Sequence, residues 1–62
     1  SRVMDKIIKI LMQRDGMSRS EAKELVDETR ELLLSSDPWE ADEIMADQLG
    51  LEPDYIMDIL GL

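Results

Sequence analysis

The sequence predicts an all-α fold, a small orthogonal bundle of four helices, formed as one domain by residues 1–62. Three observations support this prediction. Apolar residues recur at helical spacing in four short segments, and corners that contain Gly, Pro or Ser separate these segments. The apolar residues are mostly aliphatic, because aromatic residues make up only 3% of the chain. With 62 residues and no cysteine, stability has to come from packing alone.

The first helix is expected over residues 3–14, with an apolar stripe through positions 4, 7, 8 and 11. Ile10 and Met12 widen this stripe, so the helix is either central in the bundle or meets a partner. Gly16 suits the left-handed position that ends a helix. We expect the first two helices to form an antiparallel hairpin.

The second helix is expected over residues 19–35. Ser18 and Glu21 form a capping-box pattern, in which each side chain accepts a hydrogen bond from the other residue's backbone N–H. Lys23 and Asp27 lie one turn apart and make a favourable pair. The predicted core face consists of Ala22, Leu25, Val26, Thr29, Leu32 and Leu33.

The third helix is expected over residues 38–49. Asp37 is a good N-cap, Pro38 suits the first helical position, and Glu40 completes an Asp-x-x-Glu version of the capping box. Trp39 is the largest apolar group in the chain, and we expect it to be partly buried against the second helix. The predicted core face consists of Ala41, Ile44, Met45, Gln48 and Leu49.

The fourth helix is expected over residues 53–60, after a corner at Gly50 and with Pro53 at its first position. Asp54 and Asp58 are predicted to face solvent. The predicted buried side chains are Tyr55, Ile56, Ile59 and Leu60.

Residues 41–60 resemble a helix-turn-helix unit in the spacing of Ala46, Gly50, Leu51, Ile56 and Ile59. In that DNA-binding family, the second helix presents basic and amide side chains to phosphates and bases. In this chain the corresponding exposed positions are acidic: Glu52, Asp54 and Asp58. Because a duplex would be repelled, we interpret the corner as scaffold geometry and do not expect direct DNA binding.

Charge divides the chain into two unlike halves. Residues 1–30 carry seven bases and six acids, whereas residues 31–62 carry nine acids and no base. We therefore predict a non-enzymatic protein-interaction module whose acidic second half docks onto a basic protein surface. A face that only improves solubility is the simpler interpretation of the same charges. The candidate partner-binding residues are Glu40, Glu43, Asp47, Glu52, Asp54 and Asp58.

Three other functions stay open. A nucleic-acid-binding helix-turn-helix protein, possibly dimeric, could use the basic side chains of the first half, provided that Lys6, Lys9, Arg14, Arg19 and Lys23 converge on one face. Carboxylates at phosphate-like separations could also mimic a nucleic acid and inhibit a protein that binds one. A homodimer could form through surplus apolar groups, namely Ile10, Leu33, Leu34, Met57 and Leu62.

Enzymatic chemistry is not expected. The chain has no histidine and no cysteine, which removes most general acid-base, nucleophilic and zinc chemistry. No calcium loop or phosphate-binding glycine loop occurs, so we predict no cofactor and no metal. The apolar runs are too short for a membrane span, and the first residues lack a secretory signal. We expect a cytoplasmic protein.

Two stretches, 17–22 and 50–60, resemble those of small uncharacterised acidic helical proteins of bacteriophages and other mobile elements. That resemblance implies no assigned activity. It favours an accessory or inhibitory protein that acts by binding.

Overall fold

A computed structural model describes residues 2–62 of the chain. It is 84% helical, which confirms the all-α fold class, and no strand occurs in residues 2–62. The third and fourth predicted helices each begin with a single 3-10 turn, a common start for an α-helix. The elements in chain order are α1 (Arg2–Asp15), α2 (Arg19–Ser35), η1 (Pro38–Glu40), α3 (Ala41–Leu49), η2 (Pro53–Tyr55) and α4 (Ile56–Leu60).

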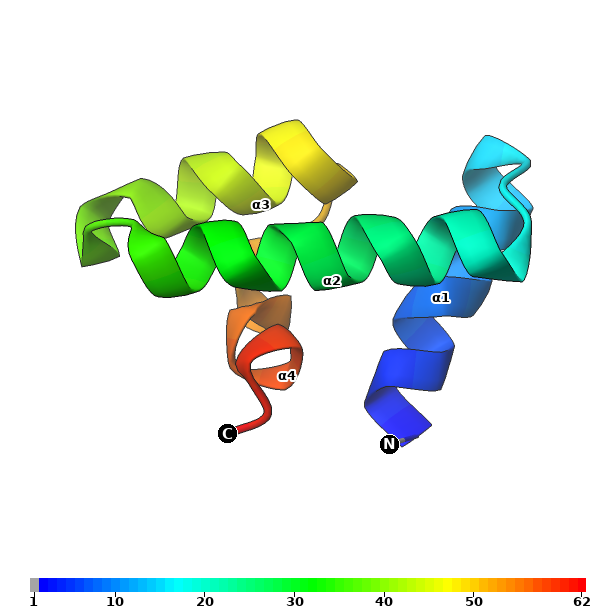
Figure 1. Cartoon of the computed structure of the whole chain (residues 1–62), viewed down its shortest axis with the longest axis horizontal. Helices are drawn as coiled ribbons and strands as arrows, with labels where there is room; N and C mark the ends of the chain where they lie inside the picture. Colours follow the sequence, from blue (N-terminus) through cyan, green and yellow to red (C-terminus); the bar gives the residue numbers. More distant parts are fainter. Residues whose placement is uncertain (1) are drawn as a thin grey trace.

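Helix α2 is the centre of the bundle, and the other three helices pack against it (Figure 1). Helix α3 runs alongside α2 in the opposite direction, and α4, which is drawn below α2 in Figure 1, contacts both α2 and α3. Helix α1 crosses the first turns of α2 steeply. The helical hairpin is therefore formed by α2 and α3, and the prediction that the first two helices form it is wrong.

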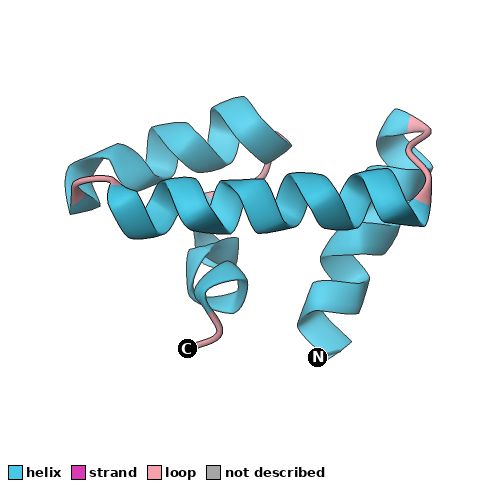
Figure 2. Cartoon of the chain, viewed as in Figure 1, coloured by secondary structure: helices cyan, strands magenta, loops and turns pink. Residues whose placement is uncertain are grey.

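The steep crossing of α1 has a physical reason in its wide apolar face. Ile7, Ile8 and Leu11 are all buried, and α1 packs against both α2 and α4. In the crossed arrangement, one face of α1 contacts both of these helices. Figure 2 shows that the connections are short, so little of the chain lies outside the helices.

The core lies between α2 and the other helices and is almost wholly aliphatic. Its buried polar side chain is Thr29, whose hydroxyl donates to the carbonyl oxygen of Leu25 at 2.8 Å. Leu32, predicted to be buried, is 38% exposed, because it lies about 100° around the helix from Leu33. The buried apolar residues are Ile7, Ile8, Leu11, Ala22, Val26, Leu33, Met45, Leu49 and Ile59.

The start of α2 has the predicted capping box. The N–H of Glu21 donates to Ser18 Oγ at 3.0 Å, and the N–H of Ser18 donates to Glu21 Oε1 at 2.9 Å. This second bond, from the backbone to the carboxylate, lowers the pKa of Glu21. The side chains therefore satisfy two donors that a helix start leaves without partners.

The predicted capping box at Asp37 does not form. The N–H of Glu40 donates to the backbone oxygen of Asp37 at 2.9 Å, so a 3-10 turn takes the donor that the Asp37 side chain would have capped. The proline prediction is confirmed, since Pro38 is the first residue of η1.

Trp39 is 79% exposed, so its predicted burial against α2 is wrong. The position of Trp39 in η1, directly before α3, gives the reason. Trp39 precedes the half-buried Ala41 by two residues, about 200° around an α-helix or about 240° around a 3-10 turn, and so lies away from the core face.

The corner between α3 and α4 has the predicted conformation. Gly50 has φ 61°, in the left-handed region, and its N–H donates to the carbonyl oxygen of Ala46 at 2.9 Å. Pro53 starts η2. Ala46 itself is exposed, so it does not provide the close helix contact that the helix-turn-helix spacing implies.

Candidate interaction surface

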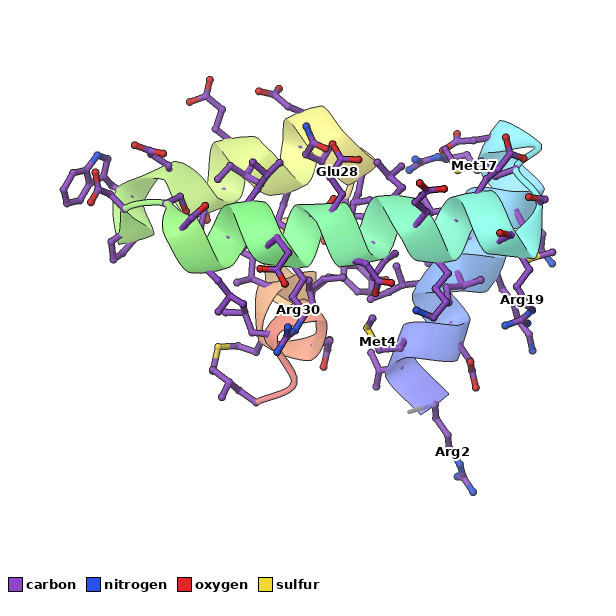
Figure 3. The ribbon with its side chains drawn as sticks, viewed as in Figure 1. Arg2, Met4, Met17, Arg19, Glu28 and Arg30 are labelled. Atoms are coloured by element: carbon purple, nitrogen blue, oxygen red, sulfur yellow. The ribbon has the colours of Figure 1, made fainter. Side chains whose placement is uncertain are left out.

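The outer face of α3 and η1 carries three of the six candidate residues. Glu40, Glu43 and Asp47 are spaced by three and four residues, which places them on one side of a helix. All three are exposed, on the side opposite the buried Met45 and Leu49. Figure 3 shows oxygen-tipped side chains that project from α3 away from α2. We call Glu40, Glu43 and Asp47 the acidic stripe.

The other three candidates lie on different elements. Glu52 and Asp54 are exposed at the α3–α4 connection. Asp58 lies in α4, and it is half-buried, contrary to its predicted exposure. Asp58 directly precedes Ile59, which is 1% exposed, so it borders the buried face of this short helix. Glu52, Asp54 and Asp58 therefore lie outside the single helical face that Glu40, Glu43 and Asp47 share.

No ion pair in residues 2–62 involves the acidic stripe. The recorded pairs all lie in the first half: Arg14 with Asp15 at 2.7 Å, Arg19 with Asp5 at 3.9 Å, and Lys23 with Asp27 at 2.7 Å. The chain has no base after Arg30. The negative charge of the acidic stripe therefore faces solvent, where only mobile ions screen it.

Arg14 has a structural task that the sequence pattern did not reveal. Its guanidinium donates to the backbone oxygens of Leu49 at 2.6 Å and Gly50 at 3.0 Å. Those carbonyls belong to the end of α3, where a helix lacks internal donors and carries a partial negative charge. The last turn of α3 contains no base of its own, and this absence is the signal that could have suggested a distant cation.

Asp15 completes the arrangement around Arg14. Its carboxylate accepts from Nε at 2.8 Å and from Nη2 at 2.7 Å. This hydrogen-bonded pair lowers the pKa of Asp15 and raises the pKa of Arg14. Arg14 is thus engaged by α3 and by its own neighbour, rather than presented to a partner.

Three of the five basic residues named for nucleic-acid binding have partners within the chain. Arg19 and Lys23 pair with acids, and Arg14 caps α3. Figure 3 shows Arg2 at the start of α1, Arg19 at the start of α2 and Arg30 farther along α2, near α4. Arg14, Arg19 and Lys23 are thus engaged by groups of the chain itself.

Several large apolar side chains remain on the surface. Exposure reaches 79% for Trp39, 56% for Leu34, 55% for Met57 and 80% for Leu62. Leu33, which we had included among the surplus apolar groups, is only 8% exposed and belongs to the core. Ile10 is half-buried.

The described surface, residues 2–62, has no pocket and no group of three acidic side chains placed to hold a metal ion. Among the helices of that part, none combines the length and the apolar character needed to cross a bilayer. No protein-family model, curated protein or solved structure matches the chain.

Proposed function

We propose that this protein is a non-enzymatic interaction module that docks the acidic stripe onto a basic surface of another protein. The observation that carries the proposal is a row of three exposed carboxylates on one helical face. None of the three forms an ion pair within residues 2–62. Complementary charge of this kind accelerates association and selects partners. The proposal includes a cytoplasmic setting, because the core needs no disulfide.

Nucleic-acid binding through the first half has less support. Three of its five candidate bases are engaged by acids or by backbone carbonyls. Nucleic-acid mimicry is a special case of the main proposal, in which the basic partner surface is itself a nucleic-acid-binding groove. The resemblance to bacteriophage proteins stays a prediction and would fit such an inhibitory role.

The test compares two variants that remove equal charge. The stripe variant carries Glu40→Gln, Glu43→Gln and Asp47→Asn. Its matched control carries Asp5→Asn, Glu24→Gln and Asp27→Asn, which are exposed positions in the first half. Breaking the two surface ion pairs in the control should change stability by less than about 1 kcal/mol.

The immobilised wild-type chain and both variants are incubated with lysate of the source organism and washed with increasing salt. We expect the wild type and the control to retain a basic protein that salt releases, and the stripe variant to retain much less of it. If all three chains retained the basic protein equally, the acidic stripe would not bind it and would serve only to improve solubility. Added duplex DNA should displace the partner only if mimicry is involved.

A further inference from the structure

Trp39 is presented to solvent by a rigid turn. Tryptophan is a strongly buried residue type on average, yet this side chain is 79% exposed. Pro38 fixes the backbone directly before it, and the N–H groups of Glu40 and Ala41 close the 3-10 turn by donating to Asp37 and Pro38. The indole is therefore held ready for contact, which reduces the entropy lost on binding.

The turn lies at one end of the long axis of the molecule, where α2 gives way to α3 (Figure 1). Leu34, 56% exposed, is five residues before Trp39, so their backbones are at most about 17 Å apart. Asp37 and Glu40 flank the indole in sequence, and both are exposed. Glu40 also belongs to the acidic stripe, so the stripe begins at the residue directly after Trp39.

This chain offers no complementary site for its own indole. The described surface has no pocket. A two-fold symmetric dimer through the turn would bring like patches together, and with them the acids of both copies. An anionic membrane would also repel these carboxylates. Charge complementarity instead favours a partner protein with basic groups around an apolar site.

We infer that Trp39 is the anchor of the interface, and that it inserts into an apolar pocket of the partner whose rim carries lysine or arginine. This inference rests on the proposed docking function and specifies the partner's chemistry. A rim cation can contact Glu40 and can also stack on the indole face. Buried tryptophan side chains of this kind often dominate interface energies.

The experiment adds two variants to the capture described above, Trp39→Ala and Met57→Ala. Met57 is 55% exposed in α4, far along the chain from the turn, and serves as the matched control. The salt-released basic protein is then purified and titrated into each chain. We expect Trp39→Ala to weaken binding about 30-fold or more, and Met57→Ala to change it less than about threefold.

Trp39 is the only tryptophan of the chain. If the partner lacks tryptophan, or its tryptophans are replaced, the tryptophan fluorescence of the complex reports on Trp39 alone. We expect a blue shift and protection from acrylamide when the partner is added. Far-ultraviolet circular dichroism of each variant must match the wild type, and Trp39→Phe should recover part of the lost affinity.

The outcomes separate the two proposals. If the stripe variant loses the partner while Trp39→Ala keeps it, docking through acids stands and the anchor is refuted. If Trp39→Ala alone loses it, the anchor stands and the acidic stripe does not. If no captured protein depends on Trp39 for its retention, the inference is contradicted. It is also contradicted if the Trp39 emission shifts to the blue only with phosphatidylglycerol vesicles, or only when the concentration of this chain is raised.

Discussion

Residues 2–30 and residues 31–62 both bury an aliphatic face in the same core, but they differ in how they treat charge. In the first part, the three ion pairs lie within α1, within α2 and between these two helices. In the second part, no base is present to pair with nine acids. Arg14 reaches across to the second part, where it binds backbone carbonyls at the end of α3 rather than a carboxylate.

The two capping-box sequences show the same contrast at the level of a single turn. Ser18 and Glu21 use their side chains to satisfy the start of α2. Asp37 and Glu40 have the corresponding spacing, but the backbone closes the turn itself. Acidic side chains of the first part therefore contribute to the fold, whereas those at η1 are left for solvent or a partner.

The largest expected effect separates core from surface within α4. Ile59→Ala should lower the free energy of unfolding by about 2–5 kcal/mol, because Ile59 is 1% exposed and its removal leaves a cavity. A domain of this size has only about 3–9 kcal/mol in total. Met57 lies two residues before Ile59 and is exposed, so Met57→Ala should change the free energy of unfolding by less than about 0.5 kcal/mol. Urea unfolding followed by circular dichroism measures both, and equal losses would mean that α4 packs by another face.

The next largest effect is expected where Arg14 contacts the end of α3. Gly50→Ala should cost about 1–2 kcal/mol, because φ is 61° and the added Cβ would lie 3.3 Å from Nη1 of Arg14. Gly16→Ala is the matched control, with φ 70° and no atom within 4 Å of the added Cβ. Thermal unfolding should show a larger loss at Gly50 than at Gly16. That excess should vanish when both changes are made in an Arg14→Ala background, and an undiminished excess would refute the contact.

A smaller effect compares the two capping sequences. Ser18→Ala should cost about 1 kcal/mol, because it removes a formed side-chain cap. Asp37→Ala should cost less than about 0.5 kcal/mol, because its side chain makes no cap hydrogen bond. Chemical denaturation of both variants tests the comparison. A loss at Asp37 that matched the loss at Ser18 would show that the second box also forms in solution.

The same box predicts a dependence on pH. Folding lowers the pKa of Glu21 from its ordinary value of 4.5. The ionised carboxylate therefore stabilises the fold fully above pH 4.5, and this stabilisation disappears as the pH falls through the pKa of Glu21 in the folded state. The wild type should therefore lose stability relative to Glu21→Gln as the pH is taken from neutral to below 4.5. Unfolding midpoints of the two chains that ran parallel throughout would contradict the hydrogen bond to Ser18.

Much of the fold could be predicted because local signals agree with one another. The Ser18–Glu21 box, Gly50 and Pro53 each mark a helix boundary where the structure has one. The pairing of helices could not be predicted in this way, because a wide apolar face such as that of α1 fits an antiparallel neighbour as well as two crossed ones. Only packing against α4 distinguishes the two arrangements.

The surface was harder to predict, for a related reason. Trp39 was predicted to be partly buried against α2 because of its size and hydrophobicity, although its spacing from Ala41 places it outside. The side chains of Glu40, Glu43 and Asp47 could be grouped from their spacing, because they share one helical face. Their separation from Asp58 depends on the side of α2 that α4 occupies, which no local spacing determines.

The exposed indole of Trp39 lies beside carboxylates that have no ion pair within residues 2–62. Quenching of Trp39 fluorescence by caesium and by iodide, at constant ionic strength, tests this arrangement directly in the isolated chain. Relative to free N-acetyltryptophanamide, we expect caesium to quench more strongly and iodide more weakly, and the stripe variant to reduce this difference. The account would be contradicted if the ratio of the caesium and iodide quenching constants equalled that of the free compound. It would also be contradicted if neutral acrylamide did not quench the indole.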